Sequence, residues 1–377
     1  MICGFRGLVC DLDGVVYLGP APVPHAVDAL TLAIRLGVQP VFATNSAART
    51  PAEVTAHLRR LGIAVDDHAV VTSAHAGAAH LAGVLPPDAR VLAVGGPGVS
   101  WALAEAGLHP VDRFEAAAGP AVEAVLQGLG ADVSWADLAE VALAVQCGAL
   151  WVATNRDLTV PTDRGLCPGN GALIGAVAPA AGTPPIVTGK PELAMYHVCA
   201  TRLGVALGDL LAVGDRLDTD IAGANRCGAS SLHVLTGVTG VEDLVMAEGE
   251  RRPRFLATDL RALHRPYLPA SVPGSPGAAP EPVARGASLG GADGSAAVRA
   301  SAQCGAARVS VLHDGDVRCT QTTAPSCRAD QLDRADHRLR AIVGAAWAAR
   351  DGGWVPSDAA LARLAGWYDE AMRGQSR

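Results

Sequence analysis

The sequence predicts an α/β protein with a doubly wound parallel sheet, an inserted α/β domain and a small C-terminal α/β extension. Short apolar runs alternate with helical segments whose apolar residues recur every three or four positions, which is typical of a doubly wound sheet. Polar residues follow several of the strand-like runs, where such sheets bind their ligands. A stretch rich in Pro, Gly, Ala and Ser, residues 268–295, separates the last part of the chain and predicts a flexible linker.

Composition narrows the function classes open to this chain of 377 residues. Half of the residues are hydrophobic, so a large core is available, and the net charge of −7 gives no reason to expect nucleic acid as a partner. No apolar run is long enough to insert into a membrane. Nine cysteines occur without a Cys-x-x-Cys pair, so we expect reduced thiols in a cytoplasmic protein rather than a disulfide frame or a zinc site.

Strand and helix signals alternate in order along the N-terminal part. An apolar run at 8–10 predicts a buried strand that stops at Asp11-Leu12-Asp13-Gly14, and a second strand, at 38–43, stops at Thr44-Asn45-Ser46. The helical pattern at 53–61 is closed by Gly62. The remaining predicted elements are helices at 22–37 and 74–82 and a short strand at 70–73.

Residues 79–182 are expected to form the inserted domain. Its strand at 90–94 ends in Gly95-Gly96-Pro97-Gly98, which fits neither a dinucleotide-binding nor a phosphate-binding loop and therefore indicates a glycine turn. Further on, a strand-like run at 149–153 leads into Thr154-Asn155-Arg156-Asp157 and then Pro168-Gly169-Asn170-Gly171.

The core is expected to comprise residues 1–78 and 183–266. Its second part has strand-like runs at 186–188, 210–213 and 230–235, a helix at 221–227 and a sheet edge at 256–260. After the linker, taken as 267–295, the extension at 296–377 has two strands around Asp314-Gly315, which is a hairpin signal. Those strands are predicted at 307–312 and 317–322, and two helices at 329–350 and 358–372.

Four segments place polar side chains just past a strand or at the start of the next helix. Because the carboxyl ends of parallel strands meet at one crevice, we expect these side chains to lie close together. Carboxylates gathered there repel unless a cation lies between them, and oxygen ligands without His or Cys favour Mg²⁺. Taken alone, Asp11-Leu12-Asp13-Gly14 could equally be a turn with solvated carboxylates. The residues are Asp11, Asp13, Thr44, Asn45, Lys190, Asp215 and Asp220.

Lys190 is also unusual because of its residue type. Of the 30 lysines and arginines, only Lys190 is a lysine. A compact ammonium group in a chain that otherwise uses the planar guanidinium indicates a site that needs a point charge. The simpler alternative is chance retention of a lysine on the surface.

This set of residue types points to phosphoryl transfer. A carboxylate can attack phosphorus and form an aspartyl-phosphate, and a second carboxylate two residues on can protonate the leaving oxygen and then activate water. A hydroxyl and an amide donor can hold the phosphoryl oxygens. Lysine and Mg²⁺ can neutralise the charge that develops on the transferred group.

The four motifs, in order and spacing, resemble those of the haloacid dehalogenase superfamily of phosphohydrolases. They are Asp11-Leu12-Asp13-Gly14-Val15 with Tyr17, Thr44-Asn45, Gly189-Lys190-Pro191, and Gly214-Asp215 with Asp220. The resemblance covers about residues 5–265. It implies that Asp11 is the nucleophile and Asp13 the acid/base. It also implies that Asp11, the backbone carbonyl of Asp13 and Asp215 hold Mg²⁺, with Asp220 in the near shell.

An insertion between the Thr44 and Lys190 motifs is similar to that of the class IIA subgroup, the NagD-like and 4-nitrophenylphosphatase-like enzymes. The segment from Thr154 to Gly171 resembles the cap signature of that subgroup and implies that Asn155 contacts substrate, although the subgroup usually has other residues where Arg156 stands. The whole arrangement resembles the actinobacterial glycerol 3-phosphate phosphatases, whose tail is likened to a partial acetyltransferase-type fold. A homodimer formed through the cap is an assembly that this resemblance allows.

The expected function is therefore a Mg²⁺-dependent phosphomonoesterase for a small phosphate ester, with glycerol 3-phosphate as the favoured substrate. Phosphoglycolate and pyridoxal phosphate are alternative substrates. A phosphomutase and a non-catalytic sensor of a phosphate ligand are alternative functions. Asn155 could instead cap a turn. The tail has no glycine pattern for acetyl-CoA, so a structural or interaction role is expected there.

Overall fold

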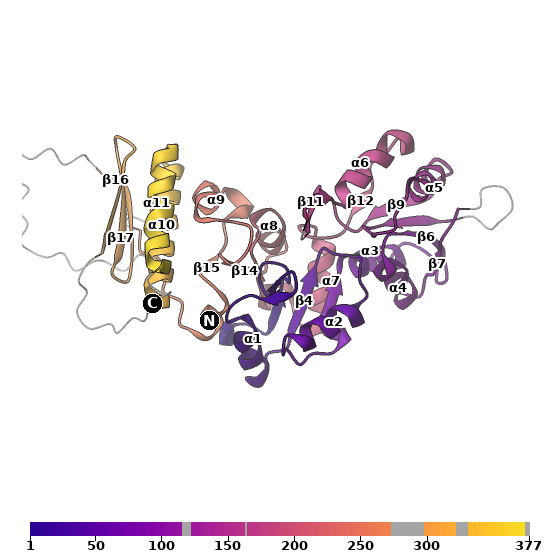
Figure 1. Ribbon diagram of the computed structural model, residues 1–377, viewed down its shortest axis with the longest axis horizontal. Helices are drawn as coiled ribbons and strands as arrows, with labels where there is room; N and C mark the ends of the chain where they lie inside the picture. Colours follow the sequence, from indigo (N-terminus) through magenta and orange to yellow (C-terminus); the bar gives the residue numbers. More distant parts are fainter. Residues whose placement is uncertain (115–121, 163, 273–297, 322–330, 374–377) are drawn as a thin grey trace, which may run out of the picture.

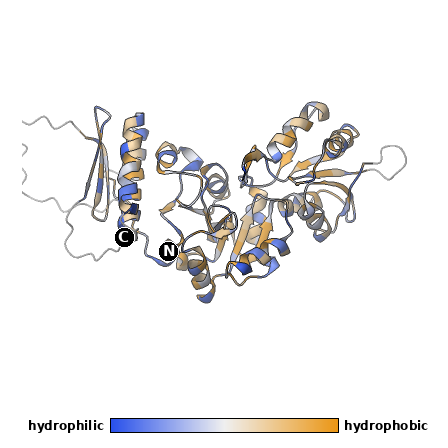
Figure 2. Ribbon diagram, viewed as in Figure 1, coloured by the Kyte–Doolittle hydropathy of each residue, from blue (hydrophilic) through white to orange (hydrophobic). Residues whose placement is uncertain are grey.

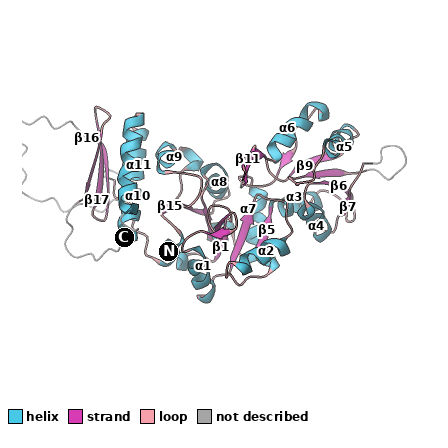
Figure 3. Cartoon of the chain, viewed as in Figure 1, coloured by secondary structure: helices cyan, strands magenta, loops and turns pink. Residues whose placement is uncertain are grey.

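The computed structural model describes residues 1–114, 122–162, 164–272, 298–321 and 331–373 (Figure 1). The first sheet lies in the middle of the molecule, between a second α/β unit and the C-terminal strands and helices (Figure 3). Apolar residues concentrate on the strands of the two parallel sheets, as Figure 2 shows. None of the described helices is long and apolar enough to cross a bilayer.

The core is a six-stranded parallel sheet covered on both faces. Its buried strand β1 alternates between these faces: Leu8 and Cys10 pack toward α1 and α2, whereas Val9 packs toward α7 and α8. This is the doubly wound arrangement that the alternation of strands and helices predicts. The strand order is β15 (Phe255–Ala257), β14 (Ser230–Val234), β13 (Leu210–Gly214), β1 (Gly7–Cys10), β4 (Pro40–Thr44) and β5 (Val70–Thr72). The helices are α1 (Ala26–Arg35), α2 (Pro51–Arg60), α7 (Leu193–Leu203) and α8 (Ala222–Arg226).

A second parallel sheet of five strands forms the cap. Its two faces pack against α3 with α4 and against α5 with α6, so it has a core of its own. A hairpin of β10 (Thr159–Thr162) and β11 (Gly165–Pro168) projects from it. The strand order is β12 (Ile186–Val187), β9 (Leu150–Ala153), β8 (Ala124–Gln127), β6 (Arg90–Val94) and β7 (His109–Val111). The helices are α3 (Ser73–Ala82), α4 (Pro97–Glu105), α5 (Trp135–Gln146) and α6 (Asn170–Ala181).

The chain leaves the cap later than the sequence suggested. Residues 186–188 were expected in the core, after an insertion that ends at 182. Instead, β12 pairs with β9 in the cap sheet, and the Thr188 N–H donates to the carbonyl of Ala153 over 3.2 Å. A strand of two residues has no periodicity that could assign it to either sheet. The loop that carries Lys190 therefore begins in the cap and ends in the core.

The segment Gly95-Gly96-Pro97-Gly98 is more than a turn, because α4 begins at Pro97. Here the cap also packs tightly against the core loop that follows Thr44. A Cβ atom on Gly96 would lie 2.2 Å from the carbonyl oxygen of Ala48, and one on Gly98 would lie 2.3 Å from that of Arg49. Only glycine allows so close an approach of two backbones.

The C-terminal extension forms an antiparallel sheet backed by two helices. It comprises β16 (Val298–Cys304), β17 (Ala307–Leu312), β18 (Val317–Gln321), α10 (Gln331–Asp351) and α11 (Asp358–Arg373). The hairpin turn falls at Gly315, with a φ of +89°, where Asp314-Gly315 predicts it. Residues 273–295 of the expected linker lie outside the described residues, but Leu268 is held in place because its carbonyl accepts from Arg340 Nη1 over 3.2 Å.

The extension shares a hydrophobic core with the edge of the core domain. Buried side chains of α10 and α11 form one cluster with those of α9 (Val241–Met246) and with Leu256 of β15. The Asp336 carboxylate accepts from the Thr258 N–H over 2.7 Å, and Arg340 Nε donates to the Leu256 carbonyl over 3.1 Å. The extension is thus packed onto the edge of the core sheet.

Candidate active site

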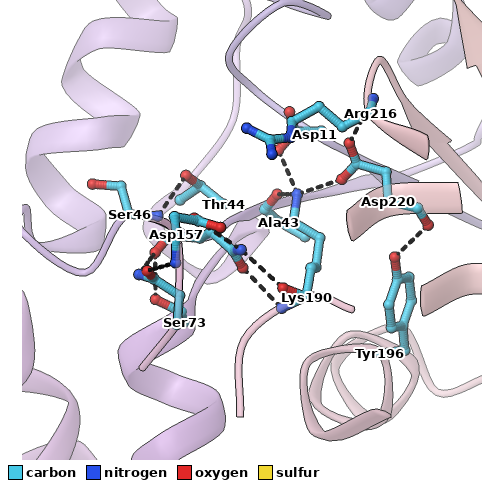
Figure 4. Close-up of polar contacts among 12 residues, drawn as sticks. Asp11, Ala43, Thr44, Ser46, Ser73, Asp157, Lys190, Tyr196, Arg216 and Asp220 are labelled. Carbon is cyan, nitrogen blue, oxygen red and sulfur yellow. Dashed lines mark hydrogen bonds and ion pairs between the residues drawn. The ribbon is translucent and has the colours of Figure 1, made fainter. Parts of the chain in front are cut away.

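The carboxyl ends of β1, β4 and β13 bring the predicted motifs together around Lys190 (Figure 4). Its Nζ donates to Asp11 Oδ1 over 2.5 Å, to Asp220 Oδ1 over 2.7 Å and to the Ala43 carbonyl over 2.9 Å. The lysine side chain is 5% exposed. A buried ammonium with three hydrogen bonds is not a lysine retained by chance on a surface, so the simpler alternative for Lys190 is wrong.

Three carboxylates meet at this point. Asp11, Asp215 and Asp220 each offer one oxygen atom, and these atoms lie within 4.8 Å of one another. Burial raises the pKa of Asp11 well above its usual range, against the opposing charge of Lys190. Burial, followed by the charge of Asp220, raises the pKa of Asp215 to about 6. Three carboxyl groups this close to one lysine cannot all ionise at low cost, so the cluster favours either a bound proton or a second cation.

Asp215 lies in a socket that fits its carboxylate closely. Oδ2 accepts the Val238 N–H over 2.7 Å, while Oδ1 is buried and has no partner among the described residues. A Cβ atom on Gly14 would lie 2.5 Å from Oδ2, and one on Gly237 would lie 2.0 Å from it. Gly14 also has a φ of +84°, which favours glycine. The socket therefore leaves Oδ1 without a partner among the described residues and available to a ligand.

Asp220 is fixed from three sides. Its Oδ1 accepts from Lys190, its Oδ2 accepts the Arg216 N–H over 3.2 Å, and its carbonyl accepts from Tyr196 Oη over 2.7 Å. Gly214 allows this packing, because a Cβ atom there would lie 2.1 Å from the Cβ of Asp220. Nothing in the sequence pattern identified Tyr196, which lies on α7 and reaches the cluster through tertiary packing.

Asp13 lies apart from the three clustered carboxylates, and its side chain is exposed. Desolvation raises its pKa, while the positive charges of Arg49, Lys190 and His57 oppose that rise. A carboxyl group that can reach solvent and has a raised pKa keeps its proton to a higher pH than an ordinary aspartate, which suits a group that donates and accepts protons.

Thr44 and Asn45 follow β4 and differ in what their side chains do. Thr44 Oγ1 accepts the Ser46 N–H over 3.1 Å and keeps its own proton to donate. Asn45 Nδ2 donates to the Lys190 carbonyl over 3.0 Å and to Asp157 Oδ2 over 3.2 Å, and Oδ1 accepts the Lys190 N–H over 2.8 Å. Both amide protons of Asn45 are used in these bonds, which hold the backbone of Lys190. That Asn45 contacts a phosphoryl group stays a prediction.

The side chain of Asn155 also bonds to backbone groups. Its Nδ2 donates to the Asn45 carbonyl over 2.7 Å, its Oδ1 accepts the Asp157 N–H over 3.1 Å, and the residue is 5% exposed. The bond to the Asp157 N–H is the one that the turn-capping alternative expects. That Asn155 contacts substrate stays a prediction. Together with Asp157, this residue fastens the cap to the core loop beside Lys190, a contact that the local Asn-x-Asp pattern does not reveal.

Two family models match the chain. One, described as haloacid dehalogenase-like hydrolase, matches residues 8–109, and one described as HAD-hydrolase-like matches residues 187–263. Among curated proteins, a D-glycerol 3-phosphate phosphatase of Mycobacterium tuberculosis is 47% identical over 72% of this chain and 74% of its own length. An acid sugar phosphatase of Staphylococcus haemolyticus is 35% identical over 68% of this chain and 94% of its own.

Solved structures show the same relationship. A glycerol phosphate phosphatase from Mycobacterium tuberculosis in complex with magnesium is 39% identical and superimposes with a TM-score of 0.72, covering 92% of each chain. A p-nitrophenyl phosphatase from Archaeoglobus fulgidus is 30% identical, with a TM-score of 0.62 over 68% of this chain and 97% of its own. With the clustered carboxylates and the lysine in place, the chain belongs to the haloacid dehalogenase-like hydrolases and is a phosphatase.

Proposed function

We propose that this phosphatase is Mg²⁺-dependent and hydrolyses glycerol 3-phosphate to glycerol and phosphate. The observation that carries the chemistry is the buried contact between Lys190 and Asp11, beside two further carboxylates. The substrate is supported by the relative from Mycobacterium tuberculosis, which is 47% identical and is named for glycerol 3-phosphate.

The residues at the cluster fit a magnesium ion. All their donors are hard oxygens, and the buried Oδ1 of Asp215 lacks a partner among the described residues. We assign the ion to Asp11, Asp215 and the backbone carbonyl of Asp13, with Asp220 beside them. When bound, it neutralises negative charge on the phosphoryl group and on the carboxylates. A relative of known structure is described as a complex with magnesium, which supports this assignment.

The first chemical step transfers the phosphoryl group to the protein. A carboxylate oxygen of Asp11 forms a bond to phosphorus while the bond from phosphorus to the glycerol oxygen breaks. Asp13 supplies the proton that the departing glycerol oxygen takes up, and its raised pKa favours the protonated form that this role needs. Lys190 places its positive charge next to the attacking oxygen, where it stabilises the transferred group.

The second step returns the protein to its starting state. Asp13, now deprotonated, takes a proton from water, and the water oxygen forms a bond to phosphorus as the bond to Asp11 breaks. The hydroxyl of Thr44 can donate to a phosphoryl oxygen, because its oxygen already accepts from Ser46. Asn45 is a positioning residue in both steps, since it holds the backbone of Lys190.

Phosphate release from a panel of small esters, with Mg²⁺ present, tests this function. We expect the highest kcat/KM for glycerol 3-phosphate, and lower values for phosphoglycolate and pyridoxal phosphate. A higher value for either of these would replace the proposed substrate but keep the chemistry. A phosphomutase or a sensor would release no phosphate from any ester, and that result would overturn the proposal.

A further inference from the structure

A buried histidine on β14 holds the backbone of one of the clustered aspartates. His233 is fully buried, and its Nε2 lies 3.0 Å from the carbonyl oxygen of Asp215. A carbonyl oxygen only accepts, so Nε2 carries the proton of this bond and donates it. The imidazole is thus bonded to the main chain of a residue whose carboxylate belongs to the cluster.

The sheet register explains how the imidazole reaches this carbonyl. His233 is paired with Gly214 across the parallel strands β14 and β13, and Asp215 follows Gly214 in the chain. Paired residues of neighbouring strands direct their side chains to the same face of the sheet. Because Gly214 has no side chain, nothing attached to it separates the imidazole from the next peptide group. The sheet itself therefore sets this contact.

The segment that follows β14 supplies two further bonds to Asp215. The Thr239 N–H donates to its carbonyl over 3.3 Å, and the Val238 N–H donates to its Oδ2 over 2.7 Å. Residues 233–239 thus direct three hydrogen bonds at Asp215, two to its carbonyl and one to its carboxylate. Of these three, the bond from His233 is the one that comes from a side chain, so it depends on the type of residue at this position.

The same segment also holds the loop of the first motif. The hydroxyl of Thr236 donates to the Gly14 carbonyl over 2.6 Å, and Gly14 follows Asp13, whose carbonyl is assigned to the magnesium ion. Residues 233–239 therefore connect the backbone around two of the assigned ligands. A change in this segment is expected to affect the spacing of those ligands.

The second ring nitrogen argues against a role of His233 in stability alone. Nδ1 is buried and has no hydrogen-bond partner among the described residues. A buried polar atom without a partner is destabilising, whereas an apolar side chain of similar size would fill the same space without that cost. The bond from Nε2 to Asp215 is therefore what distinguishes histidine from leucine at this position.

We propose that His233 is a positioning residue for magnesium, which fixes the peptide group of Asp215 and through it the Oδ1 oxygen that would bind the ion. The inference rests on the proposed Mg²⁺ dependence and adds to it a residue that does not touch the ion. Without the bond from Nε2, the Asp215 carbonyl keeps the longer bond from Thr239, and its peptide group is less restricted. Residues that orient metal ligands in this way typically contribute about tenfold to a hundredfold in metal affinity.

Calorimetric titration of the metal-free protein with Mg²⁺ tests this role with two variants at one position. H233L removes both ring nitrogens with little change in volume, whereas H233Q keeps an amide donor at about the place of Nε2. We expect the dissociation constant for Mg²⁺ to rise about tenfold in H233L and to stay within about twofold of the wild-type value in H233Q. Rescue by the donor separates positioning from the filling of space.

The matched control is S231A, two residues earlier on the same strand and on the same face of the sheet. Ser231 is also fully buried, but its hydroxyl donates to Asn225 Oδ1 over 2.8 Å and accepts the Arg254 N–H over 3.0 Å. S231A should lower the free energy of unfolding of the metal-free protein and leave the affinity for Mg²⁺ unchanged. H233L should do the reverse, because leucine leaves no buried nitrogen unpaired.

Wild-type affinity for Mg²⁺ in H233L would overturn the inference, as would a loss in H233Q as large as that in H233L, or an equal loss in S231A. If H233L does not fold, H233N replaces it in the comparison, because its shorter amide does not extend to the place of Nε2. Failure of the proposed function is distinguishable. A wild-type protein that binds no Mg²⁺ refutes the metal assignment together with this inference, whereas Mg²⁺ binding without turnover of glycerol 3-phosphate refutes the proposed function alone.

Discussion

Lys190 Nζ lies 2.5 Å from Asp11 Oδ1, and this contact joins the only lysine of the sequence to the first carboxylate of its strongest motif. The two residues are 179 positions apart in the sequence. Asp11 follows a strand of the core sheet, whereas Lys190 follows β12, the last strand of the cap sheet. The contact therefore depends on how the two sheets are placed. Asn45 maintains that placement by binding the backbone of Lys190.

Replacing Lys190 by arginine tests whether the site needs a compact ammonium group. The K190R variant keeps the charge but must fit a planar group among three acceptors within 2.9 Å. Displacing reacting groups by about 1 Å can cost about a hundredfold in rate, so we expect a loss of that order in kcat. K190A should lose more, because the charge is removed as well. Wild-type turnover in K190R would refute this role.

Magnesium should be required for activity and should also stabilise the fold. Chelation with EDTA should reduce activity to background, and added Mg²⁺ should restore it, because the three carboxylates repel one another without a cation. Ca²⁺ should inhibit, since its larger and looser coordination does not maintain the geometry for transfer. The thermal unfolding midpoint should rise with Mg²⁺ in the wild-type protein and much less in D215N. Full activity after exhaustive chelation would contradict the metal assignment.

We expect that breaking the contact between the extension and the core lowers the free energy of unfolding but leaves the chemical steps unchanged. Arg340 is 5% exposed and pairs with Asp336 over 3.2 Å, so R340A leaves a buried carboxylate without its cation. Removing one partner of such a pair costs about 3 kcal/mol, which urea unfolding would detect. The control R318A removes an exposed arginine of β18 and should change the free energy of unfolding by less than about 0.5 kcal/mol. A loss in R340A no larger than in R318A would show that the pair does not stabilise the fold.

His75 predicts how stability depends on pH. Burial lowers its pKa from 6.5 to about 3, with Arg202 adding to the effect, and its Nδ1 accepts the Thr72 N–H over 2.9 Å. The unfolded chain thus binds a proton between pH 6.5 and 3 that the folded chain does not. Stability contributed by the neutral ring is complete above pH 6.5 and falls as the pH decreases.

The loss from this histidine should reach about 2 kcal/mol at pH 5, from about 1.4 kcal/mol per pH unit. Urea unfolding of the wild-type protein and H75Q at pH 7.5 and pH 5 measures it, because the difference between the two proteins removes the contributions of other groups. H75Q should lose less stability than the wild-type protein over this interval. The same loss in both proteins would show that His75 binds its proton equally well in the folded chain.

The sequence predicted the core sheet and the residues of the site because both depend on local signals. A buried strand followed by Asp11 or Asp215 is visible as an apolar run that stops at a carboxylate. Their convergence follows from the rule that parallel strands end at one edge of the sheet. The single lysine was equally visible, and the structure places it within hydrogen-bonding distance of Asp11 and Asp220.

The parts that sequence reasoning missed depend on contacts between distant segments. No local pattern shows that the amide of Asn45 bonds to Lys190 and Asp157, which lie more than 100 residues away in the sequence. The two residues of β12 carry no pattern that assigns them to a sheet. The sequence predicts helices at 329–350 and 358–372, but only tertiary structure shows that α9 packs against α10 and α11.

The central claim is that Asp11 carries the phosphoryl group during turnover, and trapping that intermediate tests it most directly. The protein is mixed with Mg²⁺ and radiolabelled glycerol 3-phosphate and quenched in acid within milliseconds. Borohydride reduction and peptide mass spectrometry then locate the acyl phosphate. The account predicts label in the peptide that contains Asp11, reduction at that residue, and no label or phosphate release in D11N that remains folded. Label on another residue, or wild-type turnover in D11N, would contradict it.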